Sequence, residues 1–162
     1  MSEFAFLDST VLGNFARVVR LDLLESILDA RGLWTAAVEY EVTRKLPATT
    51  HAAIGRWLGE PVGIDNPAEI REVHRLRRVV FGGADTQSLQ HLGEAETCFL
   101  LTERAEFVGS RWVIDNPEVL AFARRRGITT VQSNELLSQA VLEGKIAPDH
   151  AREVLIAMRC GG

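Results

Sequence analysis

Acidic residues follow two apolar stretches that are typical of short buried strands. Asp8 comes directly after FAFL (residues 4–7), and Asp115 comes directly after RWVI (residues 111–114). Ligands of open parallel sheets bind at the carboxyl ends of the strands. If these two strands are neighbours, we expect both carboxylates at the same edge of the sheet. Asp8 also has a simpler interpretation, because aspartate is a common helix cap.

Two glutamates in expected helices extend this acidic set to four residues. Glu41 lies in VEYEV (residues 38–42), and Glu94 follows Gly93 in the first turn of its helix. Carboxylates that converge from separate elements repel one another unless cations neutralise them. Oxygen ligands without a histidine or cysteine cluster favour Mg²⁺ or Mn²⁺. Such a site binds a phosphate and activates a water molecule, as in a metal-dependent nuclease or phosphatase. Taken singly, each glutamate could equally be a solvated helix residue.

The elements that would position these acids alternate between short strands and longer helices. We expect strands at 4–7, 111–115 and 128–133, and helices after the first strand and at 21–32, 35–46, 51–61, 66–83, 93–105, 117–127, 134–146 and 148–159. Gly32 is expected to end the second helix, and Ser9 or Thr10 to cap the first. Because a return to a parallel neighbour needs a crossover, this order predicts an α/β fold, a three-layer α/β/α sandwich around a short parallel sheet.

Composition narrows the class of protein further. The chain has 162 residues, of which 46% are hydrophobic, and this fits one domain over residues 1–162. With a net charge of −4, binding to an anionic polymer would need local basic patches or metal ions. No apolar run approaches the roughly 18–20 residues that span a bilayer, so no membrane partner is expected. Cys98 and Cys160 form no CxxC pair, and a cytoplasmic location is expected.

The order of these motifs resembles the PIN domain, the nuclease fold of VapC-type toxins. The matching segments are FLDSTVL (6–12), AAVEYEV (36–42), LGEAETCFLL (92–101), WVIDNPEVLAFARRRGI (112–128) and TVQSNELLSQAVLEGKI (130–146). LGEAE beside WVIDNPEV is the most specific part of the match. The resemblance implies a Rossmann-like fold and Mg²⁺- or Mn²⁺-dependent hydrolysis of RNA. It also implies that the chain is the toxin of a toxin–antitoxin pair, with a small antitoxin protein and a second copy of the chain as partners.

The resemblance also implies a role for each acid. Asp8 takes the position of the first metal-binding and catalytic aspartate. Glu41 takes the second acidic position, with Glu39 as the alternative, and Glu94 and Asp115 take the third and fourth. Residues two apart on a helix point about 200° apart, so one of Glu39 and Glu41 faces the site. For the same reason Glu96, two residues after Glu94, is expected to face a neighbouring helix or solvent.

Four polar residues have supporting positions in this resemblance. Ser9, Thr10 and Ser133 would support the aspartates. Asn116 departs from the family pattern, which often has two adjacent aspartates where this chain has Asp115-Asn116. An asparagine can coordinate a metal through its carbonyl oxygen, but it supplies neither a negative charge nor a base. The departure keeps an alternative open, a catalytically weakened PIN-like module that binds nucleic acid or protein.

Basic clusters and other phosphotransfer folds complete the sequence picture. HRLRR (74–78) is a candidate for contact with RNA phosphates or an acidic partner, whereas ARRR (123–126) suits a helix C-terminus. A haloacid-dehalogenase-like phosphatase needs a second aspartate where Thr10 stands. The acidic pair and later lysine of a receiver domain are not evident. A dinucleotide-binding domain is rejected because no GxGxxG follows the first strand.

Overall fold

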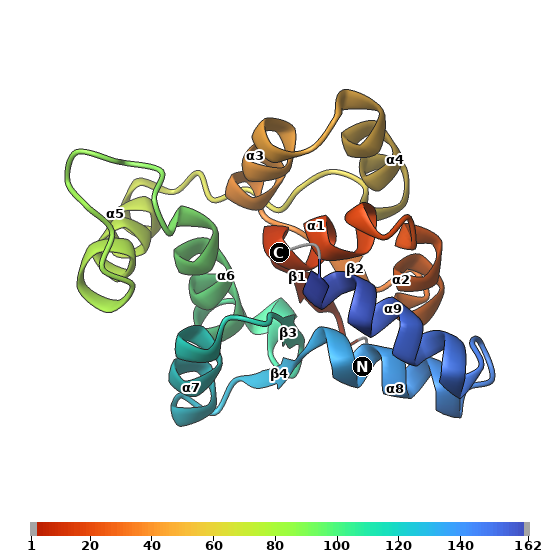
Figure 1. Ribbon diagram of the computed structural model, residues 1–162. Coiled ribbons are helices and arrows are strands. Elements are labelled where there is room, and N and C mark those ends of the chain that lie inside the picture. Colours follow the sequence, from red (N-terminus) through yellow and green to blue (C-terminus); the bar gives the residue numbers. More distant parts are fainter. Residues whose placement is uncertain (1–2, 161–162) are drawn as a thin grey trace.

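A four-stranded parallel sheet lies at the centre of the computed structural model, which describes residues 3–160 (Figure 1). The strands are β1 (Ala5–Leu7), β2 (Gly32–Leu33), β3 (Arg111–Val113) and β4 (Thr129–Val131), in the order β2-β1-β3-β4. In the β1–β3 pair, Leu7 lies opposite Val113. The chain segments that lead to Asp8 and Asp115 therefore leave the sheet side by side at its carboxyl edge. The condition for finding both carboxylates at one edge, that these two strands are parallel neighbours, is therefore met.

Helices connect the strands and cover both faces of the sheet (Figure 1). They are α1 (Ser9–Arg17), α2 (Leu21–Leu28), α3 (Ala36–Lys45), α4 (Ala48–Leu58), α5 (Pro67–Arg75), α6 (Leu92–Glu103), α7 (Pro117–Arg125), α8 (Ser133–Leu142) and α9 (Pro148–Cys160). A π-helical turn over Leu76–Val80 continues α5, and a 3₁₀ turn spans Ala105–Phe107. No helix within residues 3–160 is both long enough and apolar enough to cross a membrane.

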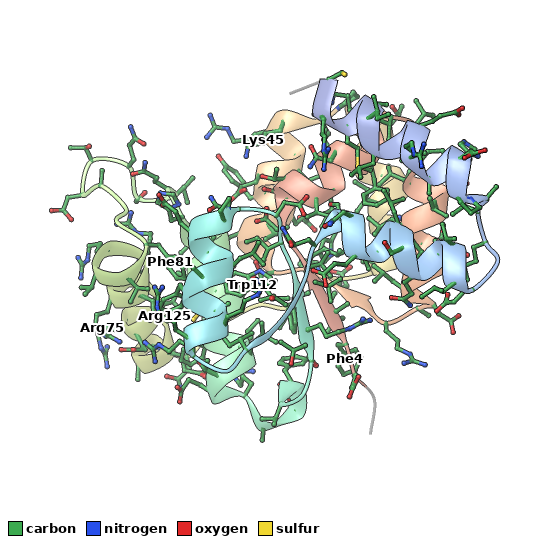
Figure 2. All side chains as sticks on the ribbon, turned by 60° about the horizontal axis from the view of Figure 1, so that its bottom comes forward. Phe4, Lys45, Arg75, Phe81, Trp112 and Arg125 are labelled. Atoms are coloured by element: carbon green, nitrogen blue, oxygen red, sulfur yellow. The ribbon has the colours of Figure 1, made fainter. Side chains whose placement is uncertain are left out.

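Two separate cores lie on the two faces of the sheet, because successive residues of a strand point to opposite sides. Leu7 and Val113 contribute to a core with α1, α2, α3, α4, α8 and α9. Phe6 and Trp112 contribute to the other core, with α5, α6 and α7. Trp112, which is labelled in Figure 2, is 1% exposed in this second core. This arrangement is the three-layer α/β/α sandwich that the sequence predicts.

The second helix and the sheet differ from the sequence prediction at Gly32. Helix α2 ends at Leu28, and Asp29 closes it in a left-handed conformation with φ 48°. Gly32 instead begins β2, a strand of two residues that the apolar pattern does not predict. A Cβ atom on Gly32 would lie 2.8 Å from the side chain of Leu58. The glycine is therefore explained by the close packing of α4 against β2, and its expected role as a helix end is wrong.

Candidate metal centre

Asp8 lies at the junction of β1 and α1 and is 7% exposed. Its backbone N–H donates to the carbonyl of Val113 (3.1 Å), so the segment stays attached to β3. Its carboxylate oxygen Oδ2 accepts a hydrogen bond from the N–H of Thr10 (3.1 Å). Asp8 is therefore the N-cap of α1, and the expectation that Ser9 or Thr10 caps this helix is wrong. The Oδ2 atom of Asp8 thus caps the helix. The residue also lies at the carboxyl edge of the sheet, where ligands of parallel sheets bind.

The structure brings Glu41 and Glu94 to the neighbourhood of Asp8. Burial, and after it the negative charges of Glu94 and Glu41, together raise the pKa of Asp8 from 3.8 to about 7. The hydrogen bond from Thr10 opposes this rise by favouring the charged carboxylate. Three carboxylates from β1–α1, α3 and α6 thus interact electrostatically. Within residues 3–160, no cation pairs with Asp8, the buried member, to offset the repulsion.

Glu41 is held by α1 and by its own helix. It accepts a hydrogen bond from the hydroxyl of Ser9, and Lys45, one turn later on α3, places its Nζ 3.6 Å from Oε2 of Glu41. A Cβ atom on Gly93 would lie 3.0 Å from Oε1 of Glu41. Glycine at position 93 therefore lets the start of α6 approach this glutamate closely. Of the two α3 candidates, Glu41 rather than Glu39 is the acid that acts on Asp8.

Glu94 occupies the first turn of α6, beside a histidine with an unusual backbone. His91 is the N-terminal cap residue of α6, in the left-handed conformation with φ 61°. Its Nδ1 lies 3.7 Å from Oε1 of Glu94. Glu96 faces elsewhere, because its Oε1 accepts the backbone N–H of Ala37 (2.8 Å) at the start of α3. The prediction that Glu96 points to a neighbouring helix is confirmed.

Asp115 leaves the same sheet edge but has partners of its own. Its Oδ1 accepts the backbone N–H of Ser133 (2.8 Å), and its Oδ2 accepts the hydroxyl of Ser133 (2.6 Å). The side-chain amide of Asn14 on α1 lies 3.5 Å from Oδ2. Ser133 thus supports Asp115 directly from the start of α8. Asn14, which no pattern in the sequence indicates, connects Asp115 to α1, the helix that Asp8 caps.

Asn116 does not offer a free oxygen to a metal. Its Oδ1 accepts the backbone N–H groups of Glu118 (2.9 Å) and Val119 (3.3 Å), so this residue caps α7. The side chain lies at the surface. The residue that follows Asp115 therefore has a side-chain oxygen that is already used by the helix.

The donor chemistry at this edge fits a hard divalent cation. Asp8, Glu41 and Glu94 supply carboxylate oxygens, which Mg²⁺ and Mn²⁺ prefer. A divalent cation would also supply the positive charge that the buried Asp8 lacks. As the side chains stand, no group of three or more His, Cys, Asp or Glu residues within 3–160 is gathered closely enough to hold an ion. Binding an ion would therefore require the carboxylates to move together.

A cleft of about 770 Å³ opens beside Glu41 and Glu94. The remaining lining residues come from the end of α3 and from the loop before α6: Tyr40, Arg44, Lys45, Thr86, Gln87, Ser88, Leu89, Gln90 and His91. The sequence gives one indication of the part of the cleft formed by α3: Tyr40 and Arg44, like Glu41 and Lys45, are four residues apart and share a helix face. The part formed by the loop before α6 has no comparable spacing pattern.

The basic cluster HRLRR (74–78) is only partly available to phosphates or to an acidic partner. Arg77 is 4% exposed and donates to the carbonyls of Ala84 (3.1 Å) and Gln87 (3.0 Å). Arg75 pairs with Glu72 at the surface. Arg77 is thus a structural residue of the loop.

No protein-family model matches this chain, and no curated protein matches it in sequence.

Proposed function

We propose that this chain is a PIN-type endoribonuclease that hydrolyses RNA phosphodiester bonds with Mg²⁺ or Mn²⁺. The observation that carries the proposal is the buried Asp8 at the carboxyl edge of the sheet, whose pKa of about 7 reflects burial and the charges of Glu94 and Glu41. Buried, mutually repelling carboxylates are typical of functional sites. The resemblance of the LGEAE and WVIDNPEV segments to PIN domains supports the same chemistry.

The acids have different roles in this proposal. Asp8, Glu41 and Glu94 would hold the ion. When bound, the ion polarises the scissile phosphate and lowers the pKa of the attacking water. Asp115 is assigned to orienting that water, since Ser133 fixes both of its oxygens in one direction. Ser9 keeps Glu41 turned toward the site through its hydroxyl, and Lys45 partly offsets the negative charge of Glu41.

The same resemblance supports a role as the toxin of a toxin–antitoxin pair in the cytoplasm, acting as a homodimer. Because the buried Asp8 has no cationic partner within residues 3–160, an antitoxin would inhibit the site by inserting a cationic side chain. Co-expression with the product of a neighbouring gene tests this role. We expect the two proteins to purify together. If the chain does not bind the neighbouring gene product, the toxin role is contradicted, whereas the proposed nuclease chemistry is not affected.

A binding module without catalysis is the second candidate function. The observation that favours it is Asn116, whose side-chain oxygen caps α7 instead of adding a fourth negative charge. In that case the cleft would hold RNA without cleaving it. RNA binding without cleavage in either metal would support this candidate.

Glu41 and Glu39 offer a matched pair of variants for testing the nuclease proposal. Both acids lie on α3, two residues apart, and Glu41 is the one that acts on Asp8. We expect Glu41→Gln to weaken Mn²⁺ binding in calorimetry by about tenfold or more and to lose RNA cleavage, a typical effect of disturbing a metal site. Glu39→Gln should behave like the parent protein. Equal metal affinity and equal cleavage in the two variants would refute the assignment.

A further inference from the structure

The cleft beside the carboxylates has two walls of different character. Glu41 and Glu94 line one region of it, so a molecule in the cleft lies next to the proposed reacting groups. One wall is the C-terminal half of α3. The other is the loop over 86–91, which lies in the green segment between α5 and α6 in Figure 1. The contents of the two walls indicate what kind of ligand fits.

The α3 wall presents an aromatic ring together with positive charge. Tyr40 is 46% exposed and is the single tyrosine of the chain. The guanidinium carbon of Arg44 lies 5.9 Å from the centre of the Tyr40 ring. Lys45, which is labelled in Figure 2, ends the helix and contacts Glu41. An exposed ring beside cations is the arrangement that stacks an unpaired base and attracts its phosphate.

The loop wall is preformed around Arg77. This buried guanidinium donates to the carbonyls of Ala84, Gln87 and Gln90, at 3.1, 3.0 and 3.4 Å. The Oε1 of Gln90 accepts the N–H of Ala84 (2.8 Å), which closes the loop further. These bonds fix the backbone from which Gln87 and Ser88 project. Amide and hydroxyl side chains on a fixed backbone can hydrogen-bond the edge of a base.

Two smaller hollows lie along the acidic edge, one sharing a lining residue with the cleft and the other sharing one with the first hollow. Lys45 also lines a hollow of about 370 Å³ together with Ser9, Asn14 and Arg17. Asn14 in turn lines a third hollow, of about 260 Å³, which contains Asp115. The shared residues Lys45 and Asn14 outline a route along α1 that an extended ligand seated in the cleft would take to reach Asp115. A single strand of nucleic acid has the shape for such a path.

We propose that the cleft is a nucleobase subsite in which Tyr40 stacks the base of the nucleotide next to the scissile phosphate. Arg44 and Lys45 contact the phosphates of that nucleotide, and the loop wall with Gln87 and Ser88 reads the edge of the base. This inference rests on the proposed function and adds its specificity-determining residue. A base paired in a duplex cannot enter the cleft, so the subsite restricts the protein to single-stranded RNA.

Binding of RNA can be measured apart from cleavage in the Asp8→Asn protein. The probe is a single-stranded RNA of ten nucleotides that carries the fluorescent base 2-aminopurine. Selective labelling of tyrosine gives one ring signal in NMR, because Tyr40 is the single tyrosine. We expect this RNA to shift the Tyr40 signal and the protein to quench the 2-aminopurine fluorescence. The same RNA as a duplex should do neither.

Variants of the α3 wall separate stacking from charge. We expect Tyr40→Ala to weaken binding by about tenfold or more, a typical effect of removing a stacking ring. Tyr40→Phe keeps the ring and should bind like the parent. Arg44→Ala should weaken binding and make it less sensitive to salt. Leu142→Ala removes a side chain that is 88% exposed on α8, and it serves as the control for loss of a surface hydrophobic group.

Three results of the binding experiments would overturn the subsite. They are an unmoved Tyr40 signal with RNA, equal binding of the duplex, and a Tyr40 signal that moves with a cationic peptide but not with RNA. If the parent cleaves RNA with metal while Tyr40→Ala cleaves it with unchanged kcat/KM, the subsite is wrong and the nuclease proposal stands. If the RNA moves Tyr40 but the parent never cleaves, the subsite stands and the nuclease proposal fails.

Discussion

The substitution Asp8→Asn should stabilise the metal-free protein at pH 8. The aspartate is 7% exposed, and burial together with Glu94 and Glu41 raises its pKa to about 7. At pH 8 the folded protein must therefore keep a buried negative charge beside two others. Asparagine has nearly the same shape and can still accept the N–H of Thr10, because asparagine caps helices about as well as aspartate. The variant removes the charge and keeps the cap.

The sign and size of the effect follow from the two pKa values. Asp8 has a pKa of 3.8 in the unfolded reference and about 7 in the folded protein. Well below pH 3.8, Asp8 is protonated in both the folded and the unfolded chain, and the contribution of the neutral Asp8 side chain to stability is fully present. The contribution is lost as the pH rises toward 7, because the unfolded chain releases its proton first. A pKa difference of about 3 corresponds to at most about 4 kcal/mol, at roughly 1.4 kcal/mol for each pH unit.

Urea unfolding at pH 5 and pH 8 in EDTA measures this difference. The parent should lose more free energy of unfolding between the two pH values than Asp8→Asn does. Asp65→Asn, at an exposed aspartate, should follow the parent. Mn²⁺ at about 100 times its Kd should restore roughly 2.7 kcal/mol to the parent at pH 8 and little to Asp8→Asn. An equal loss of stability in parent and variant would refute the interpretation of Asp8 as a buried, repelled carboxylate.

Three further substitutions test individual contacts of the site. Ser133→Ala removes the 2.6 Å hydrogen bond to Asp115 and should lower kcat by about tenfold with little change in KM, so an unchanged kcat would contradict the orienting role of Asp115. Asn116→Asp should keep the cap of α7 and change cleavage and stability little, whereas rescue of an inactive parent would favour the binding module. Gly93→Ala places a Cβ atom 3.0 Å from Glu41, and it should weaken Mn²⁺ binding and lower the free energy of unfolding by about 1–3 kcal/mol, which calorimetry and urea unfolding would check.

The sequence predicts the elements that carry long periodic patterns and strong turn signals. The strands before Asp8 and Asp115 are recognisable because apolar runs end abruptly on a charged residue. Strand β2 has two residues, too few for any pattern, and its first residue, Gly32, resembles the glycine that ends a helix. The structure explains this glycine by the close approach of Leu58 from α4. Contacts of this kind depend on packing between distant segments and leave no local signal.

The same difference between local patterns and contacts of distant segments applies to the candidate site. Helical geometry separates Glu41 from Glu39 and Glu94 from Glu96, because residues two apart point in different directions. Ser133, the partner of Asp115, lies 18 residues away in sequence, so the family resemblance rather than any local spacing indicates this contact. In the basic cluster, charge alone does not reveal that Arg77 is buried. Arg77 is enclosed by carbonyl groups of a loop that folds around it, and no spacing rule describes such a loop.

Cleavage of a mixed pool of single-stranded RNA tests the central claim most directly. The parent and Asp8→Asn proteins are compared in Mg²⁺, in Mn²⁺ and in EDTA, after unfolding curves have shown that both are folded. We expect cleavage by the parent in at least one metal, no cleavage in EDTA, and a loss of cleavage in Asp8→Asn. Equal cleavage by the two proteins, or cleavage that persists in EDTA, would contradict the central claim.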